Sequence, residues 1–329
     1  MNRALAMKGY NARPPPSHMN DQVTSSSRLS SLDALRGFDM CWILGLGGVL
    51  QAVLKNGFPH SDAAQFIAAQ LEHVPWAGFH FYDLIFPLFV FLSGVSLSLA
   101  LPRRLERDGL LATIRHLLAR GLILFLLGVF FSGGIKEGWD KIRWLGVLQR
   151  IGIASALAGL LSLRLSTRAL VVATFGILLG YAALLKWVAV PGLESPSFEE
   201  GQNLTNYLDS IWLPGRKYNG SHDPEGILSS LPAVASALFG VLAGRWLTCQ
   251  SSRTRIVRGL VIGGVLLVSA GWAWHPFFPV IKKLWTSSFV LVTAGWSCLL
   301  LDSVVTRLTG LVKKECHASI SGKASPQAS

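Results

Sequence analysis

Charged residues and cysteines are scarce in this chain, and both shortages narrow the classes of protein it can belong to. Only 15% of the 329 residues are Asp, Glu, Lys or Arg, whereas 51% are hydrophobic; a soluble domain carries about 25% charged residues. The four cysteines are Cys41, Cys249, Cys298 and Cys316, without a CxxC pair. The sequence therefore predicts neither a disulfide framework nor a metal site, and its composition indicates a protein with many membrane-spanning helices.

The first 30 residues lack the apolar core of a cleavable signal peptide. They are polar and contain Pro14, Pro15, Pro16 and a serine run. We expect residues 1–30 to form a disordered cytoplasmic tail and the first apolar segment to act as an uncleaved signal anchor.

Eight apolar stretches are long enough to cross the ~30 Å hydrocarbon layer of a bilayer, which takes about 20 helical residues. They lie at 34–54, 81–101, 116–133, 144–163, 168–190, 226–247, 258–274 and 284–302. The expected fold class is therefore all-α, a polytopic integral membrane bundle of about eight transmembrane helices. We expect one membrane domain over residues 31–310 and a polar cytoplasmic tail over 311–329.

Basic and acidic loops alternate along the chain, and this alternation predicts the orientation. The basic segments are 3–28, 103–120, 164–168, 245–258 and 307–323. The acidic ones lie between them and include the long loop 191–225, which exceeds the length of a simple connection. We expect both termini in the cytoplasm, and His73 and the 191–225 loop outside. The net charge of +12 then reflects cytoplasmic loops facing anionic lipid, not nucleic-acid binding.

Ionisable side chains at the edge of a membrane are costly and mark candidate sites. In LEHVPWAGFHFYDL, Glu72, His73, His80 and Asp83 surround Trp76 directly before an apolar span. A histidine beside a carboxylate at a half-solvated interface acts as a general base toward a hydroxyl or an amine. The structural alternatives are an interfacial aromatic for Trp76 and a helix-start carboxylate for Asp83.

Several cations are candidates for binding an anionic group. Arg36, between Asp33 and Asp39, is either an internally paired anchor or a contact for a phosphate-bearing donor. In DKIRWLGVLQRIG, snorkelling explains Arg143, but Arg150 lies deeper and needs an anionic partner or a polar cavity. Arginine also suits bidentate phosphate recognition.

Two further polar clusters are expected at the same external face as His73. NGSHDPEGILSSLPAV contributes Asp223 and Glu225, which are typical of a first helical turn. FFPVIKKLWTSSFVL contributes Lys282 and Lys283, which also suit a membrane interface. With the segments around His73 and Arg143, these clusters lie at the ends of four different helices.

Five motifs in order carry a resemblance to a known family: LDALRG, EHVPWAGFHFYDLIFPLFVFLSGVS, DKIRWLGVLQRIG, DPEGILSSLPAV and KKLWTSSFVL. Over about residues 28–302 the chain resembles the heparan-alpha-glucosaminide N-acetyltransferase family, particularly its bacterial transmembrane members. The resemblance implies an enzyme of the bacterial cytoplasmic (inner) membrane. Such an enzyme transfers an acetyl group from cytosolic acetyl-CoA to an extracytoplasmic sugar amine or hydroxyl, without a metal. Membrane lipids are expected partners, and the short C-terminus makes a homodimer reasonable.

The resemblance also assigns roles to residues. His73 takes the position of the family's proposed active-site histidine, as a base or a transient acyl acceptor, with Glu72 or Asp83 orienting it. The candidates for binding the donor are Arg36, Arg143, Arg150, Lys282 and Lys283. The candidates for binding the acceptor are Trp76, His80, Asp223 and Glu225.

Two departures from the family pattern leave alternatives open. Helix 1 carries Gly45, Gly47 and Gly48 where the lysosomal member has an asparagine linked to its active site. Family members also continue for further helices, whereas this chain turns polar after about residue 310, so we expect a short form. The alternatives are a permease for a small polar or glycan substrate, which would use the same cations and His73 as its pathway, and a truncated, inactive family member.

Overall fold

The computed structural model describes residues 32–134, 136, 138–250 and 252–303, and these ranges form helices joined by loops and two isolated β-bridges. The tails expected at 1–30 and 311–329 lie outside the described residues. The all-helical fold class expected from the sequence is confirmed for the described part.

Six helices in this part are long and apolar enough to cross a membrane. They are Leu32–Gly57, Phe81–Phe131, α5 (Val147–Arg164), α6 (Thr167–Trp187), α8 (Ser230–Cys249) and α9 (Arg253–Trp274). A shorter apolar helix, Ser287–Ser303, follows α9. The chain is therefore an integral membrane protein.

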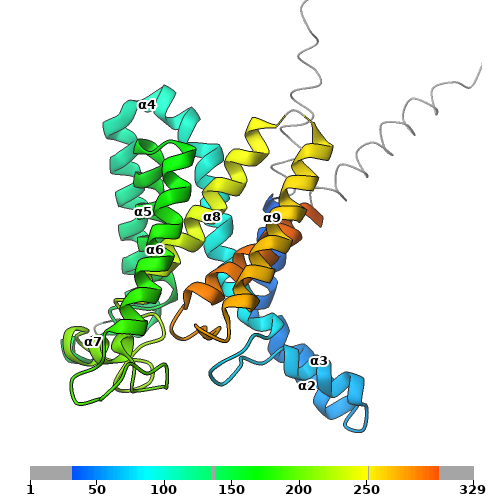
Figure 1. Ribbon diagram of the computed structural model, residues 1–329, viewed down its shortest axis with the longest axis vertical. Coiled ribbons are helices and arrows are strands. Elements are labelled where there is room, and N and C mark those ends of the chain that lie inside the picture. The colour runs from blue at the N-terminus through cyan, green and yellow to red at the C-terminus, as the bar shows by residue number, and fades with distance from the viewer. Residues whose placement is uncertain (1–31, 135, 137, 251, 304–329) are drawn as a thin grey trace, which may run out of the picture.

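The second of these helices contains α4 (Ile85–Phe131), which serves as two of the expected spans. Its 47 residues would extend about 70 Å if straight, more than twice the hydrocarbon thickness. Gly109 interrupts it with φ 76° and ψ 174°, a conformation that favours glycine, and the chain reverses its direction there (Figure 1). Counting both halves of α4 and Ser287–Ser303, the expectation of about eight spans is confirmed.

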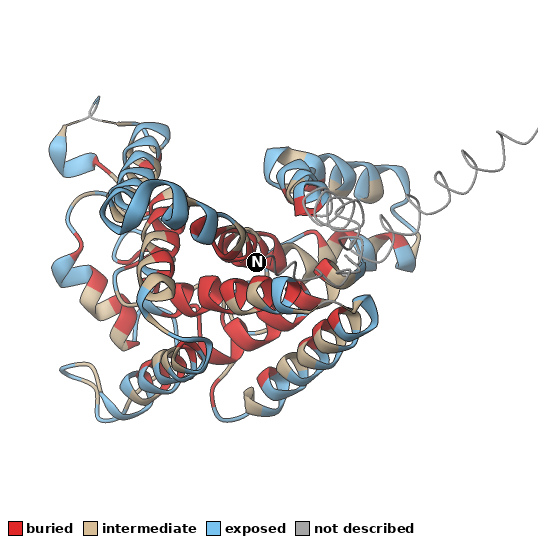
Figure 2. Cartoon of the chain, turned by 90° about the horizontal axis from the view of Figure 1, so that it is seen from above, coloured by how far each residue is buried: buried red, intermediate tan, exposed pale blue. Residues whose placement is uncertain are grey.

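The core lies where α8 crosses the first half of α4. Of the 20 residues of α8, 14 are buried, and buried residues gather in the helices at the centre of the bundle (Figure 2). A Cβ at Gly94 would lie 1.9 Å from the Ala237 carbonyl oxygen, and one at Gly240 would lie 1.9 Å from that of Phe91. The two backbones are thus in contact, as at small-residue interfaces in membranes.

The first span leaves the bundle and ends in a helical hairpin. Its regular helix is interrupted by the π-turn η1 (Trp42–Leu46), in which Gly45 has φ 113°. The helices α2 (Gly47–Gly57) and α3 (Asp62–Gln70) follow and project from the bundle (Figure 1). Such π-turns are frequent near functional sites.

The connections separate into two ends of the bundle (Figure 1). One end carries the bend at Gly109 and the α5–α6 and α8–α9 turns, within the basic segments 103–120, 164–168 and 245–258. The other end carries segments 71–80, 132–146, 188–229 with α7 (Leu204–Trp212), and 275–286. The four polar segments expected outside therefore lie at one end, and their exposure outside the cell remains a prediction from loop charge.

Candidate active site

The site begins at Asp83 in the short helix η2 (Phe81–Leu84), immediately before α4. Asp83 is 1% exposed. Its Oδ1 lies 2.8 Å from His73 Nδ1, and its Oδ2 accepts the backbone N–H groups of Val74 at 3.3 Å and His80 at 3.1 Å. These bonds close segment 73–80 into a compact turn around one buried carboxylate.

This geometry favours one tautomer of His73. A carboxylate oxygen only accepts hydrogen bonds, so the 2.8 Å contact with Asp83 favours the tautomer that carries its proton on Nδ1. Nε2 then keeps its lone pair, in the arrangement of histidine and aspartate found in catalytic triads. The His73 side chain is 53% exposed, so a substrate can reach it.

Lys282 reaches the same carboxylate from segment 275–286. Its Nζ lies 3.2 Å from Asp83 Oδ1 and 2.9 Å from His73 Nδ1. The two segments are aligned by a β-bridge between Ala77 and Ile281. Burial lowers the pKa of Lys282, and the carboxylates of Asp83 and Glu225 oppose that shift. The sequence predicted that Lys282 binds the acetyl donor, and the structure places this side chain beside His73.

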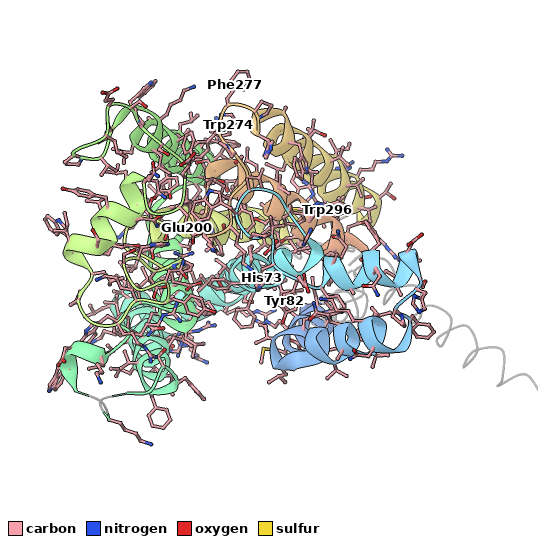
Figure 3. All side chains as sticks on the ribbon, turned by 90° about the horizontal axis from the view of Figure 1, so that it is seen from below. His73, Tyr82, Glu200, Trp274, Phe277 and Trp296 are labelled. Carbon is pink, nitrogen blue, oxygen red and sulfur yellow. The ribbon has the colours of Figure 1, made fainter. Side chains whose placement is uncertain are left out.

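Tyr82 completes the surroundings of His73, and no pattern in the sequence pointed to it. The centroids of the two rings are 4.9 Å apart, and the pair lies near the middle of the end view in Figure 3. The Tyr82 hydroxyl donates to the Trp42 carbonyl at 3.3 Å. A Cβ at Gly47 would lie 2.7 Å from the Tyr82 ring. The π-turn of the first span therefore packs directly on this site.

Glu72 and His80 form hydrogen bonds around the turn that carries His73, not with its imidazole. Glu72 Oε1 accepts hydrogen bonds from Lys55 and, at 2.6 Å, from Gln51. The bond and charge of Lys55 hold the pKa of Glu72 below its usual value. His80 Nδ1 lies 3.1 Å from the Glu72 carbonyl oxygen. Of the two expected orienting acids, Asp83 contacts His73.

A second cluster lies at the start of α5. Arg143 binds Asp223 through two bonds of 2.8 and 2.7 Å, and its Nη2 also binds Glu225 at 2.7 Å. Burial opposes the charge of this guanidinium, but its bonds to Asp223 raise the pKa of Arg143 overall. Arg143 therefore anchors segment 219–229 to the segment before α5, which is the role of an internal ion pair.

Asp209 of α7 supports the same segment and was not selected from the sequence. Its Oδ1 accepts the Ile227 N–H at 2.9 Å and its Oδ2 the Asp223 N–H at 3.4 Å. Burial raises the pKa of Asp209 to about 6. A Cβ at Gly226 would lie 1.9 Å from this carboxylate, so the turn requires glycine.

Arg150 lies inside α5 and is 1% exposed. Its Nη2 donates to the Pro224 carbonyl at 2.7 Å and to the Ser229 hydroxyl. Its guanidinium carbon lies 4.7 Å from the centre of the Trp285 ring. Nε and Nη1 are buried and make no hydrogen bond to any described residue. A buried cation with free donors suits a substrate oxygen or a water molecule.

The long loop is fastened to segment 275–286 by Glu200. Its Oε1 lies 2.8 Å from Lys283 Nζ, 3.1 Å from Asn219 Nδ2 and 3.5 Å from His222 Nε2. Burial lowers the pKa of His222. Lys283 Nζ also lies 5.5 Å from the centre of the Trp76 ring. The loop therefore closes over the side of the His73 site.

Arg36 stays apart from these residues. It pairs with Asp33 at 3.1 Å and donates to Ser96. The structure brings together His73, Asp83 and Lys282 in one group and Arg143, Asp223 and Glu225 in a second group. Arg36 belongs to neither.

Comparison with known proteins finds the family that the sequence motifs resemble, along most of the chain. A family model described as "Heparan-alpha-glucosaminide N-acetyltransferase, catalytic" matches residues 28–266. A protein named heparan-alpha-glucosaminide N-acetyltransferase from Homo sapiens is 27% identical, over 70% of this chain and 43% of its own. Its Mus musculus counterpart is 25% identical, over 70% and 44%. The chain thus spans less than half the length of these curated relatives.

Proposed function

The chain belongs to the heparan-alpha-glucosaminide N-acetyltransferase family, and from this membership we propose that it transfers an acetyl group from acetyl-CoA to a sugar amine or hydroxyl. The observation that carries the proposal is the exposed His73, held by the buried carboxylate of Asp83 beside the ammonium of Lys282. We further propose that this end faces outward from a bacterial cytoplasmic membrane, because the opposite end carries the basic loops.

His73 supplies the base in this proposal. As the acceptor nitrogen or oxygen bonds to the acetyl carbon, Nε2 takes the proton from the acceptor. The carbon–sulfur bond breaks, and the imidazolium returns its proton to the departing thiolate. Asp83 stabilises the imidazolium between these two steps. The nearby ammonium of Lys282 favours the negative charge that develops on the acetyl oxygen.

A second route uses the same lone pair as a nucleophile. Nε2 bonds to the acetyl carbon, the carbon–sulfur bond breaks and the thiolate leaves. The acceptor then bonds to the same carbon, the carbon–Nε2 bond breaks, and the freed Nε2 takes the proton of the acceptor. Incubation with labelled acetyl-CoA without acceptor, followed by denaturation and peptide mass spectrometry, separates the routes. Label on the peptide that contains His73 indicates the acetyl-enzyme. Unlabelled protein in a preparation that acetylates added sugar indicates direct transfer.

Transfer by the purified chain tests the proposal. We expect radiolabelled acetyl-CoA and a panel of amino sugars to give labelled sugar, and His73→Ala to reduce the rate at least about a hundredfold. His60→Ala is the matched control, because His60 is exposed on the α2–α3 connection. A folded chain without transfer, or an active His73→Ala variant, contradicts the proposal. Uptake of unmodified sugar into vesicles would instead establish a permease.

A further inference from the structure

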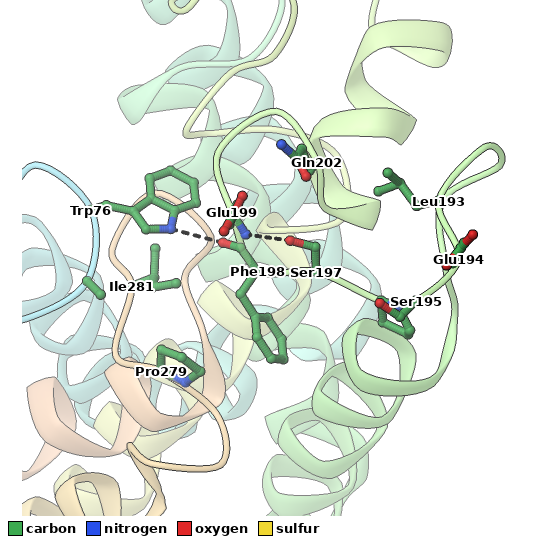
Figure 4. Close-up of a pocket in the computed structure, with 12 residues that line it drawn as sticks. Trp76, Leu193, Glu194, Ser195, Ser197, Phe198, Glu199, Gln202, Pro279 and Ile281 are labelled. Carbon is green, nitrogen blue, oxygen red and sulfur yellow. Dashed lines mark hydrogen bonds between the residues drawn. The ribbon is translucent and has the colours of Figure 1, made fainter.

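A cavity of about 550 Å³ opens between the long loop and the segments that carry His73 and Lys282 (Figure 4). Its walls are Trp76, Ala77, residues 193–199, Gln202, Pro279 and Ile281. This volume falls within the range of about 300–1,000 Å³ that is typical of sites for small molecules.

Two walls of the cavity continue directly into the His73 site. Trp76 follows His73 by three residues, so their Cα atoms are at most about 11 Å apart. Ile281 precedes Lys282, whose Nζ lies 2.9 Å from His73 Nδ1. The cavity and the His73 site are therefore neighbours along both segments.

The lining has the chemistry that binds saccharides. The Trp76 indole donates its N–H to the Phe198 carbonyl at 2.9 Å, which fixes the ring and leaves its apolar body as a surface for the carbon face of a sugar. Hydrogen-bonding side chains alternate with apolar ones along the loop; they are Glu194, Ser195, Ser197, Glu199 and Gln202. Carboxylates and hydroxyls accept hydrogen bonds from sugar hydroxyl groups.

The charge of the cavity selects among saccharides. Its described lining contains Glu194 and Glu199 and neither lysine nor arginine. Lys283 lies 5.5 Å from the centre of the Trp76 ring, but Glu200 pairs with it at 2.8 Å. The balance is negative, so an ammonium group is attracted and a sulfate or uronate group is repelled.

We propose that this cavity is the acceptor subsite, that it holds the sugar unit next to the one that reacts, and that it admits neutral or amino-bearing saccharides and rejects anionic ones. The inference rests on the proposed function, because only acetyl transfer to a sugar requires an acceptor site beside His73. It adds a binding role for the 193–202 segment, for which neither the motifs nor the His73 contacts gave a role.

Equilibrium binding in the absence of acetyl-CoA tests the inference. The probes are disaccharides of glucosamine, of N-acetylglucosamine and of a sulfated amino sugar, titrated calorimetrically into the detergent-solubilised chain. We expect the glucosamine disaccharide to bind at least about fivefold more tightly than the sulfated one. We expect Glu194→Gln with Glu199→Gln to remove this preference, and Trp76→Ala to weaken the binding of both uncharged and cationic disaccharides.

Trp76→Phe keeps an aromatic surface and retains most of the affinity, while Trp212→Ala is the control because Trp212 is 72% exposed on α7. Tight binding of the sulfated disaccharide, absence of saccharide binding, or affinity unaffected by Trp76→Ala overturns the inference. The same disaccharide titrations with His73→Ala measure saccharide binding in a chain that lacks the proposed base. Selective binding without transfer by the unaltered chain contradicts the proposed function alone. Transfer without selective binding contradicts the subsite alone.

Discussion

Asp83 illustrates how one buried residue fixes the chemistry of an exposed one. Its four contacts come from the turn before η2 and from segment 275–286; they are with His73, Lys282 and the N–H groups of Val74 and His80. A carboxylate buried without such partners would be costly. Here each partner can donate, and the contact with Asp83 favours one tautomer of the imidazole.

Replacing this carboxylate with an amide tests its role. Asp83→Asn keeps the shape but lets an amide N–H face the histidine, so the tautomer with a free Nε2 is disfavoured. We expect kcat to fall about 10²–10⁴-fold with little change in KM for the sugar. Asp62→Asn, at the exposed start of α3, should leave kcat unchanged. An unaltered kcat in a folded Asp83→Asn protein would show that Asp83 does not orient the base.

We expect the stability of the folded chain to depend on pH through His222, which lies in the long loop. Burial lowers the folded pKa of His222 below its ordinary value, so the folded chain favours the neutral imidazole. This contribution is present above about pH 6.5 and is lost as the pH falls below that value. We expect the unfolding temperature to decrease less between about pH 7.5 and pH 5.5 in His222→Gln than in the unaltered chain. Equal decreases in both proteins would contradict this assignment.

At the scale of helices, the sequence predicted the spans better than their junctions. Apolar length identified 81–101 and 116–133 as separate spans, but the helix continues between them until Gly109. The residues before this glycine, 102–108, are mostly charged, and charge alone does not terminate a helix. The π-turn around Gly45, beside which Gly47 packs on Tyr82, was not predicted either, because neither helix length nor hydropathy indicates a π-turn.

The crossing of α4 and α8 predicts a difference between two glycines. Gly240→Ala places a methyl group 1.9 Å from the Phe91 carbonyl oxygen, so the helices must move apart at a cost of about 1–3 kcal/mol. Gly263→Ala on α9 has nothing within 4 Å and should be neutral or slightly stabilising. Thermal unfolding in detergent compares them. Equal stability of the two variants would contradict the close approach of α4 and α8.

At the scale of the whole molecule, loop charge predicted which polar segments share one end, but not which side chains meet. His73 and Lys282 are 209 residues apart, and Arg143 and Asp223 are 80 apart. Such pairs leave no periodic or local signal in a single sequence. Glu200, Asp209 and Tyr82 were missed for the same reason, since the partners of each lie more than two helical turns away along the chain.

Under the proposed activity and orientation, the acetyl donor and its acceptor reach His73 from opposite sides of a membrane. Proteoliposomes with the basic end inward, loaded with radiolabelled acetyl-CoA and given amino sugar outside, test this directly. The account predicts labelled N-acetyl sugar in the external solution, none with His73→Ala, and an unchanged yield with His60→Ala. Product formed only when donor and sugar share one compartment, or sugar that enters the vesicles unmodified, would contradict it.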